Sequence, residues 1–207
     1  MIRHVSLGAV LAIAGVVAGL GCGSEPRLSS YEQNVLQARF ERDMVLRDPQ
    51  RTILAPDVRK RFGGLRYFPV DSTLRFDLRL VRVAEPETVR VSLHLGGTDP
   101  YVRVGYVEVP MPGGPYRLSA FQPASGQPVL WLPFLDATSG KETYGGGRYL
   151  YPTLAADDRL LVDFNEAHNP NCDYNPTVYN CAMPPSENRL PVPVRAGEMK
   201  SLLVETG

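Results

Sequence analysis

Two stretches in which apolar and polar residues alternate strictly constrain the fold of this chain more than any other feature. Between residues 74 and 80, leucine or phenylalanine occupies every second position, with arginine or aspartate between. Residues 89–95 repeat the pattern with valine and leucine. Successive side chains of a β-strand point to opposite faces, so each stretch predicts a strand with one buried and one solvated face. The short link at 85–87 predicts that the two strands form a hairpin.

Further strands are expected at near-regular spacing, without helical patterns between them. We expect them at 101–109, with Gly105 as a bulge, at 116–121, and more deeply buried at 129–135. This succession is typical of an antiparallel β-sandwich or barrel, so the prediction is an all-β domain that carries one N-terminal helix. Shorter candidate strands lie at 149–151, 160–164 and 190–194.

The one expected helix precedes these strands. It begins with the spacing of a capping box at residues 29–32, in which two side chains bond each other's backbone N–H groups. It should end before Pro49, because proline disfavours helical geometry in the residue before it. Leu36, Phe40 and Met44 recur at intervals of four and give the helix one apolar stripe.

The first 21 residues have the features of a signal peptide, because a positive residue precedes an apolar run that is short for a membrane span. Gly19-Leu20-Gly21-Cys22 resembles a lipobox, although the pattern has leucine three residues before the cysteine and this chain has glycine. We expect an exported protein that Cys22 anchors to the lipid membrane, on the periplasmic or outer face of the cell envelope. A tether at 22–28 would precede a single domain at 29–207. Ordinary cleavage near residue 21 and an uncleaved signal anchor are the alternatives.

The charge balance narrows the classes of partner. Lys and Arg total 22, as do Asp and Glu, so the formal net charge is zero. Nucleic-acid binders usually carry a basic excess or stripe, and we set that class aside. The glycine-rich segment at 136–149 does not match a phosphate-binding loop. No cofactor and no resident metal are expected.

Cys172 and Cys181 are the cysteines that lipidation of Cys22 would leave. An exported protein meets an oxidising compartment, which favours a disulfide between them. The alternative is a zinc site that also uses His168, but the spacing matches no common zinc motif.

The second half of the chain changes character and carries the candidate site. Residues 136–149 are polar, aromatic and rich in glycine, and residues 163–172 follow a predicted strand with polar side chains at alternate positions. Both segments are also compatible with turns, because Asn and Asp bond their own backbone. The candidate ligand-binding residues are Asp136, Glu142, Tyr144, Arg148, Asp163, Asn165 and Asn169.

The chain resembles a bacterial family catalogued as domain of unknown function 1684. The segments that carry the resemblance are 62–70, 134–149, 163–172, 181–190 and Ala196-Gly197-Glu198. The resemblance covers most of the chain from the helix onward. It implies an exported or envelope protein and supplies no established activity.

Three functions are compatible with these residues. The first is a module that binds a polar envelope ligand, a sugar or a peptide. The second is a hydrolase with paired carboxylates, for which Asp136, Glu142 and Asp163 are the catalytic candidates. The third is a structural or accessory lipoprotein with a cross-linked loop. An open groove with aromatic rings on its floor would favour sugar binding. Candidate residues that form ion pairs only with one another would favour the structural role.

Overall fold

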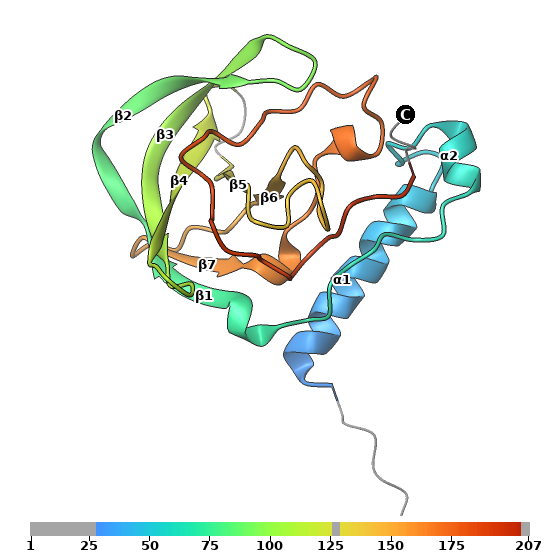
Figure 1. Cartoon of the computed structure of the whole chain (residues 1–207), viewed down its shortest axis with the longest axis horizontal. Coiled ribbons are helices and arrows are strands. Elements are labelled where there is room, and N and C mark those ends of the chain that lie inside the picture. The colour runs from blue at the N-terminus through green and yellow to red at the C-terminus, as the bar shows by residue number, and fades with distance from the viewer. Residues whose placement is uncertain (1–27, 126–128, 204–207) are drawn as a thin grey trace, which may run out of the picture.

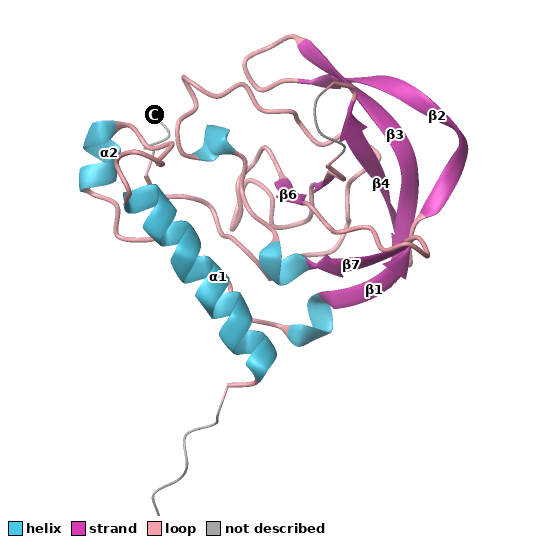
Figure 2. Ribbon diagram, turned by 180° about the vertical axis from the view of Figure 1, so that it is seen from behind, coloured by secondary structure: helices cyan, strands magenta, loops and turns pink. Residues whose placement is uncertain are grey.

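The computed structural model describes residues 28–125 and 129–203. Antiparallel strands curve around the hydrophobic core, and one long helix lies on the side opposite the largest sheet (Figures 1 and 2). The expected all-β fold with one main N-terminal helix is confirmed. The predicted signal peptide at 1–21, the lipidation site Cys22 and all but the last residue of the tether at 22–28 lie outside the described residues. None of the helices in the described ranges is long and apolar enough to cross a bilayer.

The helix α1 (Ser30–Arg47) has the predicted bounds. The Glu32 carboxylate accepts a hydrogen bond of 2.7 Å from the backbone N–H of Ser29, and the Ser29 hydroxyl accepts one of 3.2 Å from the N–H of Glu32. These reciprocal bonds satisfy N–H groups that a helix start otherwise leaves free. A short second helix, α2 (Pro56–Lys60), begins with a proline, whose missing N–H costs nothing at that position.

The apolar stripe predicted for α1 does not face the domain. Leu36, Phe40 and Met44 are 41%, 60% and 49% exposed, whereas Val35 and Leu46 are buried. The helix is therefore rotated by about one residue from the orientation that its apolar pattern predicts.

The surface beneath α1 explains this rotation, because it is rich in hydrogen-bond acceptors. The Tyr31 hydroxyl donates to the Asp163 carboxylate at 2.8 Å, and Arg39 donates to the Phe68 carbonyl at 3.0 Å. The guanidinium of Arg42 lies 3.6 Å from the buried carboxylate of Glu198 and forms an ion pair with it. The inward face of α1 is thus partly cationic, and its position depends on polar contacts as well as on apolar burial.

The strands form antiparallel pairs. In the three-stranded sheet, β3 lies between β2 and β4; β1 pairs with β7, and β5 pairs with β6. A bridge between Phe121 and Trp131 links β4 to the start of β5. The strands are β1 (Arg75–Arg79), β2 (Val81–Ser92), β3 (Thr98–Val109), β4 (Tyr116–Pro123), β5 (Leu132–Phe134), β6 (Arg148–Leu150) and β7 (Arg159–Asp163). Short 3₁₀ turns lie at Ser72–Leu74, Phe164–Glu166 and Asn171–Asp173.

The predicted hairpin between the first two strands is wrong. β1 pairs with β7 and β2 pairs with β3, so the two alternating stretches follow one another along the chain and do not pair. The link at 85–87 lies inside β2, where the register against β3 shifts between Arg82 and Glu87. β2 is an edge strand, and an edge irregularity accommodates Pro86, which has no N–H to donate.

The other strand predictions are mostly confirmed. The bulge predicted at Gly105 coincides with a register shift between β3 and β4. A side chain there would place its Cβ 2.5 Å from the carbonyl oxygen of Val81, so only glycine fits. The strand expected at 190–194 is absent from the described structure, because Pro191 and Pro193 cannot donate to a ladder and the N–H of Val194 bonds a carboxylate.

Candidate functional site

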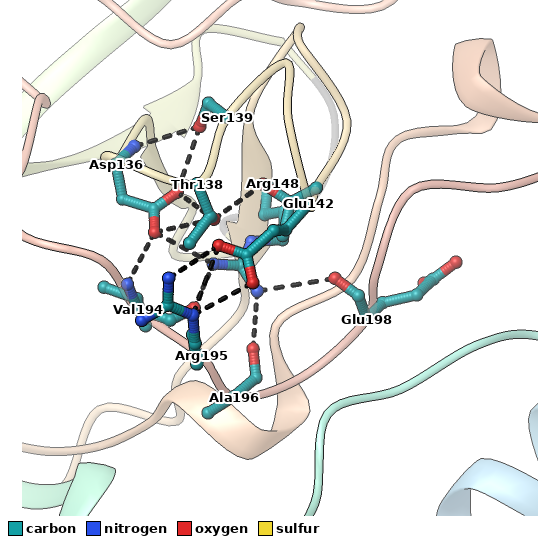
Figure 3. A network of polar contacts seen from close by, with 10 residues as sticks. Asp136, Thr138, Ser139, Glu142, Arg148, Val194, Arg195, Ala196 and Glu198 are labelled. Atoms are coloured by element: carbon teal, nitrogen blue, oxygen red, sulfur yellow. Dashed lines mark hydrogen bonds and ion pairs between the residues drawn. The ribbon is translucent and has the colours of Figure 1, made fainter.

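Asp136 and Arg148, two of the predicted site residues, form a buried ion pair inside the domain. The guanidinium and carboxylate lie 3.5 Å apart, and their side chains are 1% and 0% exposed. Asp136 also accepts hydrogen bonds from the backbone N–H of Val194 at 2.6 Å and from the Thr138 hydroxyl at 2.8 Å. Figure 3 shows these contacts converging from both sides of the carboxylate.

Arg148 fastens the C-terminal segment to the core. Its guanidinium donates to the carbonyl oxygens of Val194, at 2.8 Å, and of Ala196 (Figure 3). Burial lowers the pKa of Arg148 to about 10, and the negative charges of Asp136 and Glu198 oppose that shift. The group therefore stays charged at neutral pH and acts as a clamp for the segment.

Asp163 and Asn165 form a second polar cluster, at the end of β7. Asp163 accepts from the Tyr31 hydroxyl at 2.8 Å and from the Asn165 side chain at 3.0 Å, and it lies 3.5 Å from Arg75. Asn165 in turn accepts from the backbone N–H of Asp71 at 2.8 Å. These bonds join α1, β1 and β7, so both side chains hold elements together.

Glu142 borders the Asp136 cluster, because its backbone N–H donates to the Thr138 carbonyl at 2.9 Å (Figure 3). Glu142 forms an ion pair of 2.9 Å with Arg195, and both side chains are substantially exposed. The ring of Tyr144 packs over Gly146, where an added Cβ would approach it to 2.3 Å. Burial raises the pKa of Tyr144. The carboxylates predicted for catalysis are therefore each engaged by a different arginine: Asp136 by Arg148, Glu142 by Arg195 and Asp163 by Arg75.

The predicted disulfide between Cys172 and Cys181 is confirmed, with Cα atoms 6.1 Å apart. In the described part of the chain, no three His, Cys, Asp or Glu side chains come together as a metal site would require.

Glu198, which belongs to the Ala196-Gly197-Glu198 segment quoted for the family resemblance, is the centre of a buried polar cluster that includes the predicted site residue Asn169. It accepts hydrogen bonds from the Tyr174 hydroxyl and, at 3.2 Å, from the backbone N–H of Asn169, and it lies 3.6 Å from Arg42. Burial raises its pKa to about 7, although Arg42 opposes the shift. Asn169 also donates to Asp173 at 2.8 Å, and burial raises the pKa of Asp173 to about 6.

Next to this cluster is a cavity of about 320 Å³, which we call the aromatic pocket. Rings form its wall. Tyr101 and Trp131 have centroids 4.6 Å apart, Trp131 and Tyr149 meet edge to face at 5.2 Å, and Tyr151 stacks on His168 at 5.5 Å. The Tyr149 hydroxyl donates to the Ala182 carbonyl, which fixes its ring. The rest of the lining is mostly polar and includes Arg42, Asp99, Asn169, Asn171, Tyr179 and Asn180.

A second cavity, of about 340 Å³, separates α1 from the body of the domain, and we call it the helix pocket. It shares Arg42 and His168 with the aromatic pocket. Burial and the charge of Arg42 lower the pKa of His168 to about 4, so the ring is neutral at physiological pH. The remaining lining residues are Val35, Ala38, Arg39, Tyr67, Asn165, Glu166 and Ala167.

Comparison with known proteins identifies the family. A family model described as "Protein of unknown function (DUF1684)" matches residues 60–199. The chain belongs to the DUF1684 family. The resemblance stated from the sequence is thus confirmed. No protein with curated annotation matches.

This DUF1684 protein is also similar to a protein of known structure. An uncharacterised protein of Haloarcula marismortui, determined by solution NMR, is 32% identical to it. The match covers 83% of this chain and 95% of the other, with a TM-score of 0.63.

The sequence-predicted residues therefore divide into two groups in this DUF1684 domain. Asn165 lines the helix pocket and Asn169 lines the aromatic pocket. The other predicted residues belong to neither lining. Sequence reasoning missed Arg39 and Arg42, and it considered His168 only as an alternative zinc ligand. The signal for the arginines is their three-residue spacing in phase with the buried Val35 and Leu46 of α1.

Proposed function

We propose that this DUF1684 protein is an exported lipoprotein that binds a carbohydrate of the cell envelope in the aromatic pocket. The supporting observation is a wall of rings, Tyr101, Trp131, Tyr149 and Tyr151, beside a buried amide oxygen of Asn169 that has no partner among the described residues. Ligand sites combine apolar, aromatic walls with a few polar groups that fix orientation.

A sugar matches this combination better than an apolar ligand does. One face of a sugar ring is covered by C–H groups, which pack on flat aromatic surfaces, while its hydroxyls both donate and accept hydrogen bonds. The side chains that border the rings offer both roles. Arg42 donates, whereas Asp99 and the amide oxygen of Asn169 accept, because the amide nitrogen of Asn169 already donates to Asp173 and to the Met199 carbonyl. Tyr151 is 50% exposed, so one of these rings is reachable from solvent.

Hydrolysis receives less support. A glycosidase of the common type needs two carboxyl groups on either side of the scissile bond. Among the described lining residues, the aromatic pocket has one carboxylate, Asp99, and the helix pocket has one, Glu166. Glu198 is fully buried and belongs to neither lining, so it is not placed to act on a ligand in either pocket.

Tryptophan fluorescence tests the proposal directly, because Trp131 is the only tryptophan of the chain and lines the aromatic pocket. We would titrate the purified protein with glucose, galactose, mannose, N-acetylglucosamine and their short oligomers. We expect a saturable change with at least one of them. Tyr151→Ala should weaken that binding about three- to tenfold, because an aromatic contact contributes about 0.5–1.5 kcal/mol.

Tyr106→Ala is the matched control, because Tyr106 lies on β3 and packs against Arg117, outside both pockets. It should bind as the unmodified protein does. No saturable response to any sugar would contradict the proposal, and a response to tri- or tetrapeptides alone would indicate a peptide ligand instead.

Export and anchoring are part of the same proposal, and residues 1–22 support them. The mass of the protein purified from membranes should exceed that of residues 22–207 by the mass of the attached acyl groups. Cys22→Ser should abolish the increase. A protein that retains residues 1–21 would contradict cleavage.

A further inference from the structure

The helix pocket contains three buried hydrogen-bond donors that have no partner within the described chain. They are the Nε atoms of Arg39 and Arg42 and the hydroxyl of Tyr67. All three residues line this one cavity. An unpaired buried donor costs about 1–3 kcal/mol, and native structures leave few of them. Three such donors around one cavity therefore point to acceptor atoms supplied by a ligand.

Two hydrogen bonds and one aromatic ring fix the position of the Arg39 guanidinium. Its terminal nitrogens donate to the carbonyl oxygens of Phe68, at 3.0 Å, and Asn165, at 3.3 Å. Its guanidinium lies 4.5 Å from the centre of the Tyr67 ring. These contacts use only neutral acceptors, so the positive charge of Arg39 lacks a carboxylate within ion-pair distance in the described structure.

Arg42 is held in a similar way. It donates to the Tyr174 hydroxyl at 3.2 Å and lies 3.6 Å from the Glu198 carboxylate. Glu198 offsets much of its charge, yet the Nε of Arg42 keeps no acceptor of its own. Two fixed guanidiniums with free donors form the kind of site that binds carboxylate or phosphate oxygens.

We propose that the helix pocket binds the carboxylate or phosphate group of an acidic sugar whose ring lies in the aromatic pocket. This inference rests on the function proposed above and narrows its ligand class. Arg42 and His168 line both cavities, so the two groups of one ligand can be held on either side of them. His168 is neutral and serves as a hydrogen-bonding surface between the two parts.

One lining residue opposes an anion. Glu166 lines the helix pocket, and partial burial of its carboxyl group together with the nearby charge of Asp163 raises its pKa. Its charge should weaken the binding of an acidic ligand. Glu166→Gln should therefore strengthen that binding, which a purely structural role of this residue would not do.

The test compares sugars that differ only in charge. The fluorescence of Trp131 in the full protein would be titrated with glucose and glucuronate, galactose and galacturonate, mannose and mannuronate, and the three 6-phosphates. We expect at least one acid to bind ten times more tightly than its parent sugar, a difference of about 1.4 kcal/mol. The 6-phosphates distinguish phosphate from carboxylate.

Variants locate the acidic group. Arg39→Gln should lower the ratio of acid to parent affinity to about 2 or less, and Tyr67→Phe, which removes only an unpaired hydroxyl, should lower it about threefold. Arg47→Gln removes the same charge at the far end of α1, where Arg47 packs on Phe62, and should leave the ratio unchanged.

Each outcome is decisive. Equal affinity for acids and parent sugars overturns the inference and leaves the proposed carbohydrate binding intact. A ratio that Arg39→Gln and Arg47→Gln lower equally also overturns it, because general charge would then be the cause. Failure of every sugar, neutral or acidic, overturns both proposals.

Discussion

Glu198 gives the sharpest test of the electrostatics of this domain. Its side chain is fully buried, and burial raises its pKa from 4.5 to about 7. The folded chain therefore holds a proton on this carboxyl group over a pH range in which the unfolded chain has lost it. Stability contributed by this group is present at pH 4 and is lost as the pH rises through 7.

The magnitude follows from the difference in pKa. A tenfold change in proton affinity corresponds to about 1.4 kcal/mol, so Glu198 should cost the folded state about 2–3 kcal/mol between pH 5 and pH 8. Glu198→Gln cannot ionise, and its amide oxygen can still accept from Tyr174. We expect the stability of the variant, relative to the unmodified protein, to increase by that amount across this range.

Urea unfolding at pH 5, 6, 7 and 8 measures the difference directly. Asp173 and His168 titrate in both proteins, so their contributions largely cancel in the comparison. Glu41→Gln, on the exposed side of α1, is the control for the same change of side chain. If the difference for Glu198→Gln stays constant within about 0.5 kcal/mol, Glu198 does not titrate near neutrality and our reasoning is refuted.

Four further substitutions test the packing. Arg148→Met should lower the free energy of unfolding by about 3–5 kcal/mol, since it leaves the Asp136 carboxylate buried without its cation; urea unfolding at neutral pH measures this, and a loss below 1 kcal/mol would contradict the clamp. Gly105→Ala should cost about 1–3 kcal/mol, because its Cβ would meet a backbone oxygen at 2.5 Å. An unchanged melting temperature would show that the bulge relaxes. Val35→Ser should cost about 1–3 kcal/mol and Phe40→Ser less than about 0.5 kcal/mol, and the reverse order would mean that α1 is oriented as its apolar stripe predicts.

Local signals predicted the elements of this fold well. The capping box at Ser29, the period-two stretches and the bulge at Gly105 each depend on neighbours in sequence or on strict geometry, and each has its predicted form. Pairing depends on distant partners. The alternation at 74–80 could not reveal that β1 pairs with β7, more than eighty positions later, because period two says which face is buried and not which strand lies alongside.

The candidate site was predictable only in part, for a related reason. Asp136, Arg148 and Asp163 were selected as polar residues in a glycine-rich region, and they are indeed close to other polar groups, but those groups complete their hydrogen bonding internally. The pockets depend on how α1 docks. Their cationic residues Arg39 and Arg42 occur on a helix that is rotated by about one residue from the orientation its apolar stripe predicts, so that pattern did not place them in a pocket.

The clamp formed by Arg148 has a consequence for how the protein matures. Its acceptors are carbonyl groups of Val194 and Ala196, more than forty positions further along the chain, so the interior cannot be sealed while the ribosome has yet to add them. Until then, the charged guanidinium of Arg148 and the incomplete hydrophobic core are exposed to water. Such a chain should depend on chaperones until its C-terminal segment has been added. Truncation before residue 194 should yield aggregates and not a smaller stable domain.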